Sequence, residues 1–227
     1  MKVKERYEKL RKKISDCSKD SLEPLLVAVS KQASCSQIQE AYEAGCMDFG
    51  ENRVKDALDK ISLCSDQIRW HFIGTLQSNK ISKVVGVFET IQSVNTVKLA
   101  KGINERAGVL GIRQKVFLQV NTSEEISKHG LTVKEALACV NELNSLSNLD
   151  WQGFMTIGPA SRCEEDTRKC FKTLKNLRKS VQGDLKDNKV FSQLSMGMSG
   201  DYLIAIEEGS GILRVGSAIF CNELEVN

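Results

Sequence analysis

Lys31 is the residue whose position in this sequence most directly indicates covalent chemistry. It follows the apolar run Leu25–Ser30, which is typical of a strand buried on both faces. A lysine amine at the partly desolvated end of such a strand can form an imine with a carbonyl compound. The alternative is that Lys31 only ends the strand and extends into solvent.

Two weaker candidates follow the next two apolar segments. Asn52, in the run GENR, lies where a strand should pass into a helix, so its side chain could cap the helix or bind a ligand. His71, in the run WHF, is either a half-buried core residue or a general base, and the first of these is more common.

The last two predicted loops share a composition that suits an anion. Ser195 and Gly197 lie in SMGMSG, and Gly216 and Ser217 follow Arg214 in RVGS. Glycine lets a ligand approach the backbone closely, and free N–H groups at a helix start attract phosphate. Two ordinary capped turns would show the same residues. Arg214 could anchor a phosphate, donate to a ring nitrogen or form a structural salt bridge.

Short β-rich runs alternate with helical patterns along the chain. The predicted strands are Leu25–Ser30, Met47–Phe49, Trp70–Phe72, Val87–Ile91, Lys115–Val120, Trp151–Met155, Val190–Leu194 and Ile212–Val215. Between them, apolar residues recur at helical spacing, as in Val54, Ala57, Leu58 and Ile61. Capping boxes are expected at Ser36–Gln39 and Thr132–Glu135, and helix ends at Gly45, Gly108 and Gly209.

Eight such repeats predict an α/β fold, a single-domain (β/α)8 barrel over residues 1–227. An additional amphipathic helix, with Val3, Tyr7, Leu10 and Ile14 on one face, should precede the barrel. The main rival is an open doubly wound sheet, but no G-x-G-x-x-G follows the first strand.

Composition excludes several classes of protein. The formal net charge of +3 is too small for a nucleic-acid or anionic-membrane surface, and no apolar run is long enough for a membrane span. Eight cysteines without a C-x-x-C pair, beside two histidines, give little support for a metal site. We expect reduced thiols, a cytoplasmic location and a monomer.

Strands one and eight are neighbours in a closed barrel, so Lys31 and the two glycine-containing loops should lie together. A ligand with an aldehyde at one end and a phosphate at the other would bridge them. Pyridoxal 5′-phosphate (PLP) fits that description, and a sugar phosphate fits it less fully.

Seven runs in order support the same ligand. They are LLVAVSK, FGENRVKDALDK, WHFIGTLQSNK, QVNTSEEISKHGL, GFMTIG, LSMGMSGDYLIAI and LRVGSAIF, and they extend from about Leu25 to Phe220. Together they resemble the pyridoxal phosphate homeostasis protein family. The resemblance implies a cytosolic barrel similar to the N-terminal domain of alanine racemase, with PLP bound to a lysine.

The resemblance also implies residue roles. Lys31 is the expected Schiff-base lysine, and Asn52 an expected contact near the cofactor ring or its lysine. Ser195, Gly197, Gly216 and Ser217 are the expected phosphate ligands, and Arg214 the expected partner of the pyridine nitrogen. Lys128, in SKHG, belongs to a family motif without an assigned role.

Two functions remain open from the sequence, beside a less favoured third, a sugar-phosphate barrel enzyme. The first is a non-enzymatic carrier that buffers PLP and passes it to PLP-dependent apoenzymes. The second is a racemase-type enzyme, which would need a second proton-transfer group on the opposite face of the ring. None of Tyr7, Tyr42 and Tyr202 is an obvious candidate for that group. A cationic Arg214 beside the pyridine nitrogen would also oppose ring protonation and weaken the ring as an electron sink.

Overall fold

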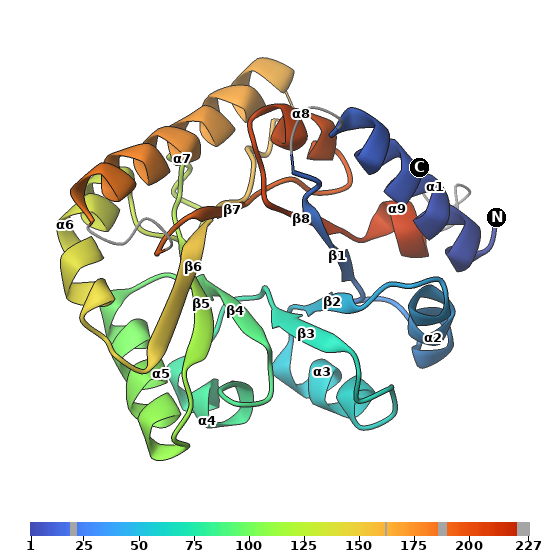
Figure 1. The fold of residues 1–227 in the computed structure, drawn as a ribbon, viewed down its shortest axis with the longest axis horizontal. Coiled ribbons are helices and arrows are strands. Elements are labelled where there is room, and N and C mark those ends of the chain that lie inside the picture. The colour runs from blue at the N-terminus through green and yellow to red at the C-terminus, as the bar shows by residue number, and fades with distance from the viewer. Residues whose placement is uncertain (19–21, 162, 186–189, 222–227) are drawn as a thin grey trace.

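Eight parallel strands close into a barrel in chain order (Figure 1), and β1 pairs with both β2 and β8. The computed structural model describes residues 1–18, 22–161, 163–185 and 190–221. Closure between the first and last strands confirms the (β/α)8 prediction and excludes the open sheet.

The strands lie close to where the apolar runs predicted them. They are β1 Leu25–Val29, β2 Asp48–Glu51, β3 Arg69–Phe72, β4 Thr90–Val94, β5 Gln114–Gln119, β6 Leu149–Met155, β7 Gln193–Ser195 and β8 Ile212–Val215. Two starts were predicted three residues early. Before β4, Phe88 is a buried turn residue whose ring packs edge-on against Phe72 at 5.3 Å. Before β7, Phe191 has a φ of 55°, which interrupts an extended backbone.

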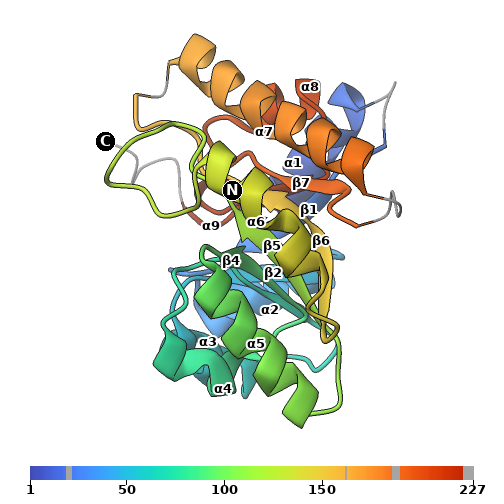
Figure 2. The same cartoon turned by 90° about the vertical axis from the view of Figure 1, so that its left-hand side faces the viewer.

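The helices follow the predicted alternation. They are α1 Val3–Cys17, α2 Cys35–Glu43, α3 Val54–Ile61, the 3-10 turn η1 Ser78–Lys80, α4 Ile81–Val84, α5 Val97–Val109, α6 Val133–Asn144, α7 Glu164–Asp184, α8 Tyr202–Glu207 and α9 Ser217–Phe220. Figure 2 shows α5, α6 and α7 following one another around the outside of the barrel. The helices therefore cover the outer face of the parallel sheet, as such a sheet requires.

Local end signals were only partly predictable. The Thr132–Glu135 capping box is confirmed, but α2 is capped by Ser34 with Gln37 rather than by the expected Ser36–Gln39 box. Gly45 and Gly209 follow helix ends with positive φ, as predicted. Gly108 does not end a helix, because α5 continues through it to Val109.

Helix α1 lies between α8 and α2 in the ring of helices and also packs against α9 (Figure 1). Its predicted apolar face is buried, namely Val3, Tyr7, Leu10 and Ile14. The buried Arg6 side chain adds a specific contact, because its Nε donates to the carbonyl oxygen of Ile219 at 2.6 Å. The helix thereby holds α9, the helix that follows β8.

The barrel interior is only partly apolar. Val27, Phe117, Met155 and Ile212 form one buried cluster. Polar side chains fill the rest, and the Gln92 Oε1 of β4 accepts a hydrogen bond from the Ser195 Oγ of β7 at 2.7 Å. Because β4 and β7 are not neighbours in the sheet, this bond crosses the inside of the barrel.

The described residues lack features of some other protein classes. No helix among them is both long and apolar enough to cross a membrane, and no cluster of His, Cys, Asp or Glu could hold a metal ion. All eight cysteines are free thiols.

Replacing Ile14 by Ala should destabilise the fold by about 2–5 kcal/mol, because the fully buried side chain would leave a cavity under α1. Chemical denaturation measures the free energy of unfolding. The control is Lys12→Ala on the exposed side of the same helix, which should change it by less than about 0.5 kcal/mol. Equal effects of the two substitutions would contradict the packing of α1.

Candidate functional site

The strand register brings the predicted site residues to one place on the barrel. Val27 and Ala28 of β1 pair with Arg214 and Val215 of β8 on one side, and Val29 pairs with Gly50 of β2 on the other. The segments just beyond these strands therefore meet at the C-terminal end of the barrel. They carry Lys31, Asn52, Gly216 and Ser217.

Lys31 lies in the turn after β1 and is exposed. Within the described part of the chain, its Nζ has no hydrogen-bond or ion-pair partner. Since a lysine acts as a nucleophile through a free amine, this exposed and unpaired position suits covalent binding of a carbonyl compound.

The peptide before Lys31 is held by a buried ion pair. Glu51 Oε1 accepts hydrogen bonds from Ser30 Oγ at 2.6 Å and from Lys60 Nζ at 2.8 Å. Lys60 Nζ also donates to the Ser30 carbonyl oxygen at 2.6 Å, and Glu51 is fully buried. This support for Lys31 is not visible in the sequence, because Glu51 and Lys60 meet only when α3 packs back on β2.

The two glycine-containing loops meet through Ser199. Its Oγ accepts hydrogen bonds from the backbone N–H groups of Gly216 at 3.2 Å and Ala218 at 3.4 Å. Two convergent N–H groups that already bind an oxygen form an arrangement suited to a phosphate oxygen. Ser199 was not among the predicted ligands, although it belongs to the same SMGMS run.

Glycine is required at two positions of these loops. A Cβ at Gly216 would lie 3.0 Å from the Val29 carbonyl oxygen, so the end of β8 could not approach β1 as closely. Gly197 has a φ of 96°, and a Cβ there would lie 2.5 Å from the Cβ of Ala205. Gly197 is buried, so its part in the site is to let α8 pack closely beneath the loop.

Arg214 extends into the interior of the barrel from β8 and is 4% exposed. Its Nη1 donates to Ser195 Oγ at 2.6 Å, and its Nη2 donates to the Thr156 carbonyl oxygen at 2.7 Å. Ser195 is fully buried, and its hydroxyl also donates to Gln92. The geometry therefore favours a role for Ser195 as a partner of Arg214, in place of the phosphate contact expected from the sequence.

Burial shifts the pKa values of two charged groups here, Arg214 on β8 and Asp201 before α8. Desolvation lowers the pKa of Arg214 to about 10, against the opposing effect of the nearby Asp201 carboxylate. Arg214 is therefore still a cation at neutral pH. Burial raises the pKa of Asp201, although a backbone hydrogen bond from Met198 and the charge of Arg214 oppose the shift.

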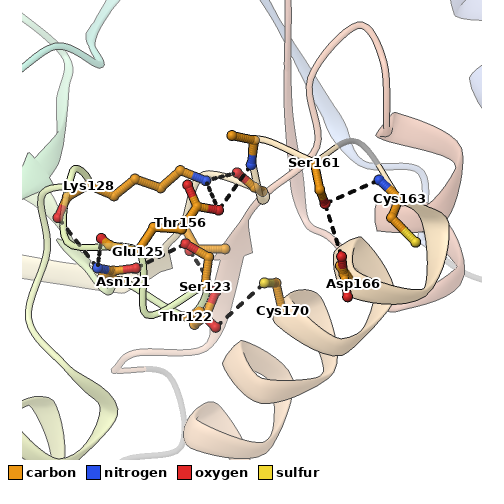
Figure 3. A network of polar contacts seen from close by, with 12 residues as sticks. Asn121, Thr122, Ser123, Glu125, Lys128, Thr156, Ser161, Cys163, Asp166 and Cys170 are labelled. Carbon is orange, nitrogen blue, oxygen red and sulfur yellow. Dashed lines mark hydrogen bonds and ion pairs between the residues drawn. The ribbon is translucent and has the colours of Figure 1, made fainter.

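Lys128 connects two loops at the same end of the barrel (Figure 3). Its Nζ donates to the Gly158 carbonyl oxygen and pairs with Glu125 Oε1 at 3.2 Å. Glu125 in turn accepts a hydrogen bond from the Ala160 N–H, which lowers the pKa of its carboxyl group. Lys128 thus holds the loop after β5 against the loop after β6.

The three tyrosines lie on helices outside the barrel. Tyr7 is on the buried face of α1, where burial raises its pKa to about 12. Tyr42 is half-buried on α2, and the Tyr202 ring on α8 has Lys13 Nζ at 5.8 Å from its centre.

A hollow of about 450 Å3 beside Asn52 is lined by Arg53, Lys55, Lys80 and Lys83, and it includes neither Lys31 nor Arg214.

The comparisons agree with this fold. A family model described as alanine racemase, N-terminal domain, matches residues 2–223. A pyridoxal phosphate homeostasis protein from Schizosaccharomyces pombe is 42% identical over 86% of this chain and 83% of its own length. The structure of PipY from Synechococcus elongatus with PLP bound is 32% identical, with a TM-score of 0.87 over 96% of this chain and 100% of PipY.

The match to the family model places this chain in the class of alanine racemase N-terminal domains. Within that class, the chain belongs to the pyridoxal phosphate homeostasis protein family. An alanine racemase from Clostridium difficile shares the fold alone, with a TM-score of 0.79 at 13% identity, over 96% of this chain and 58% of the racemase.

Gly197→Ala should destabilise the protein by at least about 2 kcal/mol, because alanine is strained at positive φ and would clash with Ala205. Thermal and chemical denaturation provide the measurement. The matched control is Gly200→Ala in the same loop, where a Cβ meets no atom within 4 Å and stability should be nearly unchanged. Similar stabilities for the two variants would show that the loop does not need glycine at 197.

Proposed function

We propose that this chain binds PLP covalently through Lys31 and acts as a carrier and buffer of the cofactor. The observation that carries the proposal is the juxtaposition across the β1–β8 seam. An unpaired lysine amine follows β1, and backbone N–H groups suited to phosphate follow β8. The family to which the chain belongs supports the same ligand.

The residues present fit PLP. The Gly216 and Ala218 N–H groups already bind one hydroxyl oxygen, and a Cβ at Gly216 would crowd Val29, so the loop keeps its backbone accessible. When bound, PLP supplies a reactive aldehyde and an electron-withdrawing ring. Lys31 would bind the aldehyde carbon, and Ser199, Gly216, Ser217 and Ala218 would surround the phosphate.

Arg214 and Asn52 would hold the ring. The guanidinium is fixed by Ser195 and Thr156 through its two terminal nitrogens, so its remaining N–H groups have a defined direction for a pyridine nitrogen. A cation there opposes protonation of that nitrogen. Asn52 follows β2 beside Lys31, where an amide can bind the lysine or the ring substituents.

The same residues favour a non-catalytic role. Racemisation needs a second proton-transfer group across the ring from Lys31. Tyr7 is on the buried face of α1 with a pKa raised to about 12, and Tyr42 and Tyr202 lie on α2 and α8. The protein would instead keep the free aldehyde low in the cytoplasm, as a monomer of one domain, and supply PLP-dependent apoenzymes.

Replacing Lys31 by Ala should abolish the visible absorbance band of the PLP-loaded protein without unfolding the barrel, because the covalent partner is lost. Borohydride reduction followed by peptide mapping identifies the modified lysine. Lys55→Ala, on exposed α3, is the matched control and should keep the band. A label on another lysine of the wild type would overturn the assignment.

Ser217→Asp should weaken PLP binding by at least about tenfold, because a carboxylate at the start of α9 repels the phosphate. Equilibrium titration monitored by absorbance gives the dissociation constant. Ser82→Asp on α4 adds the same charge at an exposed position away from the seam and should leave the constant unchanged. Unchanged affinity in Ser217→Asp would contradict the phosphate assignment.

The carrier and racemase functions differ in one measurement. Incubation of the PLP-loaded protein with alanine in heavy water should give little deuterium at the α-carbon and no sustained change in stereochemistry. Inversion at an enzyme-like turnover would reject the carrier proposal.

A further inference from the structure

A continuous chain of hydrogen-bonded side chains runs through the barrel and ends at Arg214. Arg214 Nη1 lies 2.6 Å from Ser195 Oγ, which lies 2.7 Å from Gln92 Oε1. Gln92 Nε2 lies 3.0 Å from His71 Nδ1, and His71 Nε2 lies 3.1 Å from Asp48 Oδ1. All five residues are buried, and they come from β8, β7, β4, β3 and β2. We call this set the interior chain.

The two ends, together with the Gln92 carbonyl oxygen that faces Ser195, fix the direction of every hydrogen bond in the interior chain. A guanidinium can only donate, so Ser195 Oγ accepts from Arg214. At the other end, hydrogen bonds from His71 and Arg69 outweigh burial and lower the pKa of Asp48, so its carboxylate is ionised and only accepts. Arg69 donates to both Asp48 oxygens, at 2.9 and 2.6 Å.

The groups between these ends then have one consistent arrangement. Ser195 gives its single proton to the Gln92 carbonyl oxygen, so the Gln92 amide nitrogen faces His71 and donates to Nδ1. The ring of His71 is therefore neutral and carries its proton on Nε2, which donates to Asp48. A proton on Nδ1 would face the Gln92 amide donor and would require that amide to turn over.

We propose that Gln92 and His71 are positioning residues for Arg214, acting through Ser195. The inference rests on the proposed function, because the group that Arg214 would meet is the pyridine nitrogen of PLP. Arginine has many rotamers, and a Ser195 hydroxyl whose single proton is held by Gln92 turns its lone pairs toward Arg214. The interior chain thus sets the orientation of the Arg214 guanidinium, the cation that would contact the cofactor. Gln92 and His71, which do so through Ser195, lie on the opposite side of the barrel from Arg214.

Nitrogen NMR of the wild-type protein without PLP tests the direction of the interior chain. The protein has only two histidines, His71 and His129. His129 is exposed, so the signals of its ring serve as an internal reference. With 15N-histidine labelling, His71 should show a neutral ring with the proton on Nε2 at pH 7. A proton on Nδ1, or a ring that behaves like His129, would overturn the inference whatever the cofactor does.

Gln92→Leu tests the effect on binding, with Gln114→Leu as the matched control. Gln114 is an equally buried glutamine, but it bonds the backbone of residues 86, 88 and 89 and is no part of the interior chain. Both variants should lose stability. Only Gln92→Leu should bind PLP about two- to tenfold more weakly, because Arg214 is no longer held. It should also shift the absorbance maximum of the loaded protein.

Ser195→Ala completes the test as a double-mutant cycle. The losses of PLP affinity in Ser195→Ala and Gln92→Leu should not add, because both break the same path, whereas those of Ser195→Ala and Gln114→Leu should be independent. Additive losses, or equal losses in Gln92→Leu and Gln114→Leu, would overturn the inference. A wild type that binds no PLP would instead reject the proposed function.

Discussion

The burial of the Arg214 guanidinium is the constraint on which the interior of this barrel depends. A cation taken out of water is costly unless hydrogen-bond acceptors surround it. The Ser195 hydroxyl and the Thr156 carbonyl oxygen meet that need. Both residues are held in turn, Ser195 by the Gln92 carbonyl oxygen and Thr156 through its own hydroxyl, which bonds the Thr122 hydroxyl. The polar half of the interior follows from this one charge, and the apolar cluster around Val27 fills the remainder.

The seam between β1 and β8 turns that interior into a site. Register alone places Val29 beside Gly216, the residue after Val215, and the lack of a side chain at Gly216 permits the close contact. The support for Lys31 comes from the other side, where Glu51 and Lys60 hold the Ser30 peptide. A flexible lysine on a fixed backbone suits a residue that would react with one end of a ligand while the other end is held after the neighbouring strand β8.

Local patterns predicted what is local in this protein. The β8 prediction Ile212–Val215 has the observed bounds, and the stripe that begins at Val54 marks α3 correctly, because burial on a fixed face repeats with a fixed period. The β4 prediction started early because Phe88 is apolar for a different reason, a turn in which its ring packs on Phe72, while the neighbouring Val87 is exposed. Periodicity cannot distinguish a buried turn from a buried strand.

Long-range contacts were beyond the sequence. Gln92 and Ser195 are 103 positions apart, and nothing in either run indicates that they meet inside a closed barrel. The resemblance to a known family named Lys31 and Arg214 but not Ser199, Glu51 or Lys60, whose roles depend on distances. His71 was correctly interpreted as a core residue, and only the structure connects it to Asp48 and Gln92.

The hydroxyl of Ser199 on the Gly216 and Ala218 amides has a consequence for loading and unloading. A phosphate oxygen arriving there would exchange with an acceptor of similar size, and its departure would let the serine return. Since the amide groups stay satisfied in both states, neither state requires the loops to reorganise. An anion site whose N–H groups stay hydrogen-bonded with and without phosphate suits a protein that binds and releases PLP without a change in its loops.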